Sequence, residues 1–245
     1  MSSFVQSAVT ALELVITPDP GLWTIVARSL AVSGTACLLA CGLGLVAGAW
    51  LGVGRFPGRG AVLTCLNTLL AVPSVVVGLV VYLLLSRSGP LGALGWLFSF
   101  KAMVLAQSLL VLPVVTALTR QVVEDAERSH GEQLQSLGAG TLLRGLLLAW
   151  DERYALLTVL IAAFGRAVSE VGAVMVVGGN IDGFTRVMTT VIALETSKGD
   201  LPLALALGIV LLAVVLVLNA LIALVRRWRE RVDGGAGALM AGVGA

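Results

Sequence analysis

The chain has 245 residues, of which 58% are hydrophobic and 12% are charged, and its formal net charge is +2. Its mean hydropathy of +1.01 excludes an ordinary soluble domain, because such a domain needs a charged surface that this composition does not supply. The apolar residues form blocks long enough for transmembrane helices of roughly 20 residues. We therefore predict an all-α membrane protein embedded in a lipid bilayer. No basic cluster indicates a nucleic-acid partner.

Residues 1–20 precede the first apolar block and end in Pro18-Asp19-Pro20. They contain neither a basic n-region nor a small-residue cleavage site, so they are not typical of a signal peptide. We expect a short amphipathic segment that lies on the outer surface of the membrane.

Five apolar blocks follow, and they predict transmembrane helices at about 22–53, 61–85, 101–123, 154–176 and 201–225. Gly44, Gly48 and Gly52 recur every four residues and predict one helix face that another helix can approach closely. Pro73 and Pro113 lie inside predicted spans, and each is expected to kink its helix.

The chain contains three cysteines and one histidine, the residue types that most often bind transition metals. Cys37, Cys41 and Cys65 fall inside predicted spans, where buried thiols most often pack as small apolar residues. His130 is the only histidine, which excludes a histidine-based metal or catalytic cluster. We predict neither a metal site nor a catalytic residue in this chain.

The distribution of basic residues predicts the orientation of the chain in the membrane. With the N-terminus outside, ten arginines lie on the cytoplasmic side: Arg55, Arg59, Arg120, Arg128, Arg144, Arg153, Arg226, Arg227, Arg229 and Arg231. Five basic residues then lie outside: Arg28, Arg87, Lys101, Arg186 and Lys198. We therefore predict an outside N-terminus, a transmembrane domain over 21–232 and a cytoplasmic C-terminus. The tail 233–245 is rich in glycine and alanine, and we expect it to be disordered.

Aromatic residues agree with these boundaries. Trp23 and Trp50 bracket the first predicted span, while Trp150, Tyr154 and Trp228 lie near predicted cytoplasmic ends. Tryptophan and tyrosine are enriched at the two membrane–water interfaces. The aromatic residues therefore support the predicted spans without indicating a function.

The predicted cytoplasmic loop 124–153 carries leucines at near-helical intervals, interrupted by Gly138-Ala139-Gly140. This pattern predicts two short amphipathic helices that meet at a glycine turn. Their apolar faces either pack against the ends of the spans or dock another protein.

Arg166 and Glu170 lie four residues apart in the predicted fourth span, roughly 18 and 24 Å along the helix from Tyr154. A charge at this depth costs on the order of 3 kcal/mol, so both side chains are expected to face protein or water. Either the pair is a structural ion pair, which we favour, or it lines a path together with Ser169. In a path, Arg166 would contact an anion transiently, and Glu170 would prevent tight binding.

The predicted outer stretch 177–200 is longer than a plain connection requires. Three glycines free its backbone for close approach, and donors to a tetrahedral oxyanion come from Asn180, Thr185, Arg186, Thr189 and Thr190. Such residues are also common in ordinary loops. We expect this stretch to contact a binding protein or to cap the path.

Two groups of motifs carry a family resemblance. EQLQSLG at 132–138 resembles the EAA loop of ABC importer permeases, although Gln133 and Leu134 replace the two alanines and Asp151 aligns with the family's later proline. The run GRAVSEVGAVMVVGGNIDGFTRVMTT from Gly165, together with ALETSKGD, RFPGR and SRSGPLG, is similar to tungstate importer permeases. It is more loosely similar to molybdate and sulfate permeases. The resemblance covers roughly residues 20–225.

The resemblance implies a type I ABC importer permease fold, the MetI-like fold, in a bacterial or archaeal cytoplasmic membrane. Its coupling helix would bind an ATPase subunit through Glu132, Gln133, Ser136, Leu137 and Gly138. The implied outer contacts include Glu195, Thr196, Ser197 and Lys198. The implied partners are two ATP-binding cassette subunits, an extracytoplasmic oxyanion-binding protein and a second copy of the chain.

The sequence contains no G-x-x-x-x-G-K-[ST] phosphate loop. We therefore expect this chain to bind no cofactor, and the partner ATPase to use ATP and Mg²⁺. The expected function is ATP-driven import of a tetrahedral oxyanion, tungstate, through a permease subunit that is not an enzyme. The alternatives are a molybdate or sulfate permease of the same architecture, a non-transporting membrane scaffold, and a membrane-embedded enzyme. The last would need a catalytic constellation that the sequence lacks.

Overall fold

The computed structural model describes residues 9–10, 12–13, 16 and 20–243, with the backbone alone at Arg226 and from Arg229 onward. The elements from Pro20 on are α2 (Pro20–Val53), α3 (Arg59–Ala71), α4 (Ser74–Leu85), η1 (Gly92–Leu94), α5 (Phe100–Ser136), α6 (Thr141–Asp151), α7 (Arg153–Val168), α8 (Gly172–Gly178), α9 (Met188–Lys198) and α10 (Leu201–Val243). All of them are helical, which confirms the predicted all-α class for this part of the chain. The expectation of an amphipathic segment at 1–20 falls largely outside the described residues.

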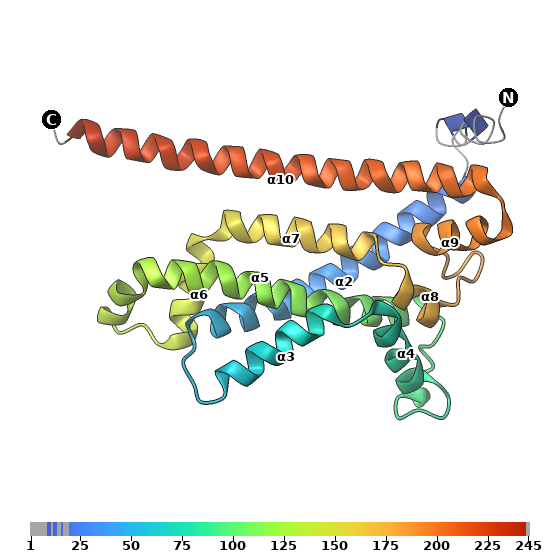
Figure 1. Cartoon of the computed structure of the whole chain (residues 1–245), viewed down its shortest axis with the longest axis horizontal. Helices are drawn as coiled ribbons and strands as arrows, with labels where there is room; N and C mark the ends of the chain where they lie inside the picture. Colours follow the sequence, from blue (N-terminus) through green and yellow to red (C-terminus); the bar gives the residue numbers. More distant parts are fainter. Residues whose placement is uncertain (1–8, 11, 14–15, 17–19, 244–245) are drawn as a thin grey trace.

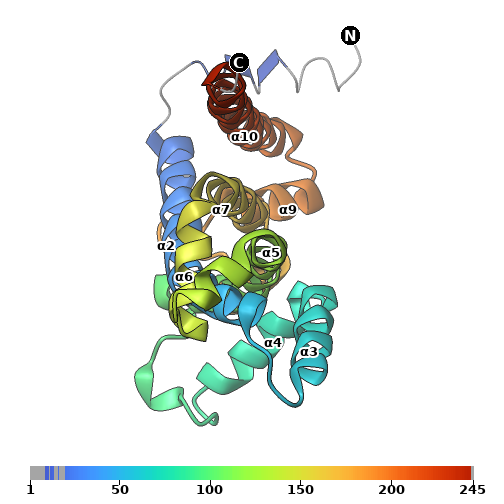
Figure 2. The same cartoon turned by 90° about the vertical axis from the view of Figure 1, so that its left-hand side faces the viewer.

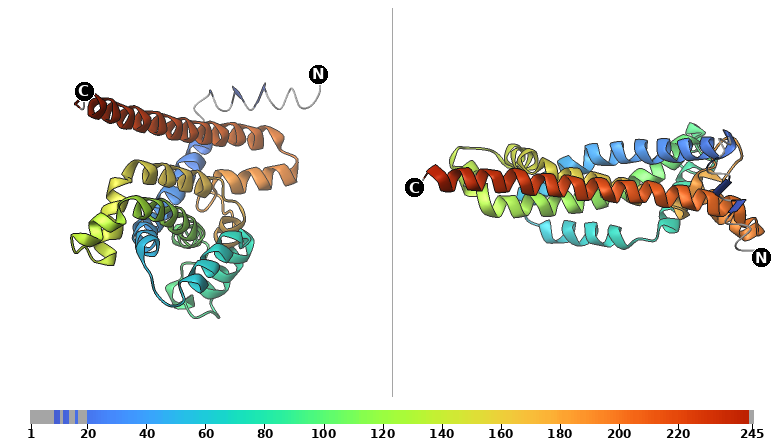
Figure 3. Two further views of the ribbon diagram at one scale, coloured as in Figure 1. Left: turned by 60° about the vertical axis from the view of Figure 1, so that its left-hand side comes forward. Right: turned by 90° about the horizontal axis from the view of Figure 1, so that it is seen from above.

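The long helices lie roughly along one axis. Figure 1 shows α2, α5, α7 and α10 following this axis, with α6 at one end and α8 and α9 at the other. The end-on view in Figure 2 places α10 beside α7, and α10 contacts both α7 and α9. The start of α2 and the end of α10 lie at opposite ends of the molecule (Figures 1 and 3).

Three described helices are long and apolar enough to cross a membrane: α2, α5 and the part of α10 from Leu201 to Val225. Two bent helix pairs, α3 with α4 and α7 with α8, would raise the number to five if each pair is one span. The structure thus confirms membrane-spanning helices. The predicted total of five depends on the two bent pairs.

The predicted helix at 61–85, kinked at Pro73, is instead two separate helices. α3 and α4 are bent by 98° at a break after Ala71, where Val72 has an extended backbone with φ −65° and ψ 128°. Proline disfavours the helical conformation of the preceding residue and supplies no N–H of its own. Pro73 therefore ends α3 instead of merely kinking it. α5, in contrast, continues through Pro113 as one helix.

Two helices extend further than predicted. α5 continues to Ser136 instead of ending near residue 123, so the first of the two predicted loop helices is the end of the third span. Glu124 forms ion pairs with Arg120 and with Arg128, and this i, i+4 spacing stabilises a helix outside the membrane. α10 continues to Val243, into the tail for which we expected disorder, and no proline interrupts it after Pro202.

The glycine face of α2 forms the central helix contact of the molecule. A Cβ at Gly44 would lie 2.9 Å from Val115 Cγ1, and a Cβ at Gly48 would lie 2.6 Å from Thr119 Cβ. Gly52 faces Val123 in the same way. The absent side chains let α2 and α5 pack backbone to backbone, which confirms the predicted close approach.

The predicted thiol packing is confirmed for two cysteines of the three. Cys37 and Cys41 are buried on α2, in a cluster with residues of α5 and α7. Cys65 is exposed on α3, so the packing prediction is wrong there. Its helix packs mainly through Leu66, which is the buried residue of α3.

Candidate functional site

The fourth predicted span is broken where its charged residues lie. α7 ends at Val168, α8 begins at Gly172, and the two helices are bent by 55°. The predicted continuous helix at 154–176 is therefore wrong. Ser169 donates a hydrogen bond to the carbonyl oxygen of Gly165 (2.9 Å), which is the competing interaction by which serine can bend a helix.

Glu170 lies in this break and is 6% exposed. Its Oε1 accepts a hydrogen bond from the backbone N–H of Ala173 (3.4 Å), so the carboxylate caps the first turn of α8. Its carbonyl oxygen accepts a hydrogen bond from Thr189 Oγ1 (2.7 Å). Side chain and backbone of Glu170 therefore connect the break to α8 and to α9.

Arg166 pairs with Glu170, as the four-residue spacing predicts, but the two side chains have different environments. Arg166 Nη1 lies 3.7 Å from Glu170 Oε2, and the Arg166 side chain is 57% exposed. The distance of 3.7 Å is longer than that of a charge-assisted hydrogen bond, so this ion pair holds Arg166 only loosely. Glu170 thus has a structural role, while Arg166 remains open to a ligand, a partner or a second copy of the chain.

Gln107 of α5 supports the same break, and sequence analysis missed it. Its Nε2 donates to the carbonyl oxygen of Ala167 (2.7 Å) near the end of α7, and the residue is 3% exposed. Ser29 of α2 accepts a hydrogen bond from the backbone N–H of Met188 (2.6 Å). Both are polar residues within predicted apolar spans, and this is the signal that could have identified them.

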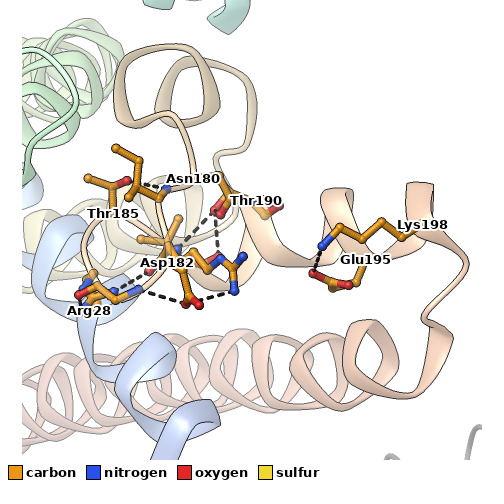
Figure 4. Close-up of polar contacts among 11 residues, drawn as sticks. Arg28, Asn180, Asp182, Thr185, Thr190, Glu195 and Lys198 are labelled. Carbon is orange, nitrogen blue, oxygen red and sulfur yellow. Dashed lines mark hydrogen bonds and ion pairs between the residues drawn. The ribbon is translucent and has the colours of Figure 1, made fainter.

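The outer stretch uses most of its polar groups internally (Figure 4). Thr185 Oγ1 donates to the carbonyl oxygen of Gly178 (2.6 Å) and accepts from Ile181 N–H (2.8 Å). Thr190 Oγ1 donates to Asn180 Oδ1 (2.8 Å). The expected oxyanion donors Thr185, Thr189 and Thr190 are all buried. The hydroxyls of Thr185 and Thr190 bond within the outer stretch, and that of Thr189 bonds to Glu170 in the break.

Charged residues of α2, of the outer stretch and of α9 also form hydrogen bonds and ion pairs in this region. Arg28 of α2 donates to the carbonyl oxygen of Gly183 (2.8 Å), and Arg186 Nη1 lies 3.0 Å from Asp182 Oδ1. Lys198 Nζ lies 3.0 Å from the buried carboxylate of Glu195. Thr196 and Ser197 are exposed on the last turn of α9. The outer residues expected from the resemblance therefore include both structural and accessible side chains.

The predicted glycine turn is present between α5 and α6. Gly138 has φ +80°, and the N–H of Ala139 donates to the carbonyl oxygen of Leu134 (3.1 Å). This left-handed cap ends α5 in the manner that favours glycine. The expected coupling residues Glu132, Gln133, Ser136, Leu137 and Gly138 are all exposed, and Leu137 is 82% exposed.

The turn is attached firmly to the spans. Arg144 Nε of α6 lies 3.1 Å from Glu127 Oε1 of α5. A Cβ at Gly145 would lie 2.6 Å from the carbonyl oxygen of Ala49, so α6 packs directly on the backbone of α2. A force applied to the turn would therefore reach both helices.

The residues that form these features match a known family of transport proteins. The family described as "Binding-protein-dependent transport system inner membrane component" matches residues 44–231, which include the α2–α5 contact, the turn and the broken span. The chain belongs to this family. It is therefore a membrane component of a binding-protein-dependent transport system and not an enzyme.

Relatives of this transport component have several named substrates. The chain is 42% identical to the tungstate uptake system permease protein TupB of Peptoclostridium acidaminophilum, over 86% of this chain and 93% of the relative. It is 43% identical to a probable anion ABC transporter permease protein of Haloferax volcanii, over 87% and 93%. It is 30% identical to the sulfate transport system permease protein CysT of a Synechocystis species, over 86% and 79%.

Proposed function

We propose that this chain is the permease subunit of an ATP-driven importer that carries tungstate into the cytoplasm. The observation that supports this substrate is the 42% identity to a tungstate uptake permease over almost the full length of both chains. Molybdate and sulfate are the alternatives, because a sulfate permease is 30% identical and a molybdenum permease 28% identical. Tungstate, molybdate and sulfate are all tetrahedral oxyanions.

We propose five spans in each copy, with the N-terminus outside and the C-terminus in the cytoplasm of a bacterium or archaeon. The positive-inside rule supports this orientation, because it assigns ten arginines to the cytoplasmic side and five basic residues to the outside. Two copies would form a homodimer with the path between them. One copy with three to five candidate spans has too few helices to enclose a path.

The turn around Gly138 is the proposed contact with two ATP-binding cassette subunits, which bind ATP and Mg²⁺. Its exposed Glu132, Gln133 and Leu137 are available to a partner, and its attachment to α2 and α5 can transmit the movement. ATP-driven closure of the ATPase pair would then shift a two-state helical assembly between outward and inward access.

We propose that Arg166 faces the path and that Glu170 limits its affinity for the anion. The support is the contrast between an exposed guanidinium and a buried carboxylate that is bonded to α8 and α9. A path needs sites that release their ligand, and a neighbouring carboxylate weakens the attraction of arginine for an anion. The exposed Thr196, Ser197 and Lys198 are the proposed contacts for the binding protein.

The substrate is tested in vesicles that contain the permease, the ATPase and the binding protein. Uptake of radiolabelled tungstate is measured against equal concentrations of unlabelled tungstate, molybdate and sulfate. We expect ATP-dependent uptake that unlabelled tungstate reduces most. Calorimetric titration of the isolated binding protein with the same three anions is the control. Sulfate that competes as well as tungstate, in both measurements, would contradict the assignment.

A further inference from the structure

An open groove of about 490 Å³ lies between α2, α6 and α7. Its apolar wall includes Val46 of α2, Leu146 of α6 and Leu157 of α7, which are 47%, 41% and 41% exposed. The groove extends from the start of α7 to Leu160, about 9 Å along the helix from Tyr154. The apolar interior of the groove therefore lies within the predicted fourth span.

Aromatic and cationic side chains surround the mouth of the groove. The guanidinium carbon of Arg153 lies 4.7 Å from the ring centre of Tyr154 and 5.8 Å from that of Trp150. Arg153 Nη1 donates a hydrogen bond to the carbonyl oxygen of Trp150 (3.1 Å). Trp150 is 73% exposed. Tryptophan, tyrosine and arginine with an apolar interior behind them are typical of the level of lipid headgroups.

A second arginine lies next to the mouth in the sequence of α10. Trp228 of α10 packs edge-on against Tyr154, with ring centres 5.1 Å apart, so α10 reaches this end of the groove. Arg227 directly precedes Trp228 and is exposed. Asp151 and Glu152 precede Arg153 in the sequence and oppose it, so the preference for an anionic ligand depends on Arg153 itself.

We propose that this groove binds an anionic phospholipid of the cytoplasmic leaflet. The phosphate lies at Arg153, near the ring of Trp150 and the part of α10 at Trp228, and one acyl chain lies along Val46 and Leu157. The leaflet assignment rests on the orientation given in the proposed function. Anionic lipids are enriched in the cytoplasmic leaflet, where basic segments next to a span attract them. A water-soluble partner would not fill an apolar groove at this depth.

The proposed lipid has a consequence for coupling. α6 follows directly after the Gly138 turn, and Trp150 lies in its last turn. A lipid held between α6, α7 and the part of α10 at Trp228 would attach the coupling region to the bilayer. The activity of the transporter would then depend on the headgroup composition of the membrane.

The test is native mass spectrometry of the purified full-length chain, titrated with phosphatidylglycerol and with phosphatidylcholine of the same acyl chains. One arginine near the membrane surface changes affinity by about fivefold. We expect phosphatidylglycerol to bind at least about fivefold more tightly than phosphatidylcholine, and Arg153→Gln to lower its affinity by about fivefold. Arg55→Gln is the matched control, because it removes an exposed arginine at the same end of the molecule. It should change the affinity by less than about twofold.

A second variant tests the apolar part of the groove without changing its charge. Val46→Trp should fill the groove and abolish the preference for phosphatidylglycerol, whereas Leu38→Trp, at a 76% exposed position of the same helix, should retain it. Equal affinity for the two lipids, equal effects of Arg153→Gln and Arg55→Gln, or unchanged binding to Val46→Trp would each overturn the proposal. The proposal would also be overturned if neither lipid binds because a second copy of the chain covers the groove. The measurement requires neither ATP nor an oxyanion, so its failure would leave the transport proposal standing.

Discussion

Glu170 shows how one residue can stabilise an interrupted span. Within the membrane a helix break leaves backbone groups without partners, and each such group costs several kcal/mol unless it is satisfied. Glu170 satisfies the first turn of α8, Gln107 satisfies the carbonyl oxygen of Ala167, and Thr189 bonds to the backbone of Glu170. The buried carboxylate is therefore part of the break and not only the partner of an arginine.

Replacing Glu170 and replacing Arg166 should have different effects on the stability of the chain. Glu170→Ala removes the acceptor for the Ala173 N–H and is expected to destabilise the chain by about 1 to 3 kcal/mol. Arg166→Ala removes an exposed side chain and should change stability by less than about 0.5 kcal/mol. Thermal unfolding in detergent measures both, with Glu170→Gln, which keeps an acceptor oxygen, as an intermediate case. Equal destabilisation by the two alanine variants would count against this division of roles.

Gly138 is expected to be required for its backbone conformation. A non-glycine residue at φ +80° costs roughly 1 to 2 kcal/mol, although no atom lies within 4 Å of a Cβ added there. Gly138→Val should lower uptake while ATPase activity persists, because the turn loses its shape. Gly138→Asn is the matched control, since asparagine tolerates the left-handed region. Normal ATP-driven uptake with valine at this position would refute a coupling role for the turn.

At the scale of elements, the α2–α5 contact leaves no room for a larger residue at its glycines. Gly48→Ala places a Cβ 2.6 Å from Thr119 Cβ and 2.7 Å from the carbonyl oxygen of Thr116. We expect destabilisation by about 1 to 3 kcal/mol from this overpacking. Gly42→Ala is the control on the same helix, because nothing lies within 4 Å of its Cβ. Thermal unfolding should separate the two variants, and an equal response would contradict the close packing of these helices.

The elements also show what the sequence could predict. The all-helical class, the presence of membrane-spanning helices and the glycine face of α2 follow from local composition and spacing, and the structure agrees with these three predictions. The break at Glu170 depends on Gln107 and Thr189, which are distant in sequence, so no local pattern revealed it. The surroundings of the expected oxyanion donors could not be predicted for the same reason, because Thr185 and Thr190 bond to partners that only the folded loop provides.

The two bent helix pairs, α3 with α4 and α7 with α8, pack against each other through α4 and α8. A Cβ at Gly78 of α4 would lie 2.7 Å from Ala173 Cα of α8. Pro73 explains the first break, and its effect was underestimated because a kink and a full interruption have the same sequence signal. The close approach of α4 and α8 follows from glycine in one partner and alanine in the other.

At the scale of the whole molecule, the orientation predicts which end is accessible from each side. In a chain with Cys37, Cys41 and Cys65 replaced by alanine, Ser136→Cys should react with an impermeant thiol reagent only from the cytoplasmic side. Thr196→Cys should react only from the outside. Both native residues are exposed, so access to the reagent depends on the membrane alone. Labelling with the opposite sidedness would contradict the proposed topology.

The central claim is that this chain forms a passive pathway and that a separate ATPase drives it by binding at the α5–α6 turn. It is tested most directly by tungstate accumulation in vesicles assembled with and without the ATPase subunits, with the permease and the binding protein present in both. We predict accumulation against a gradient only when the ATPase and ATP are present. Uphill accumulation by the permease and binding protein alone would contradict the account.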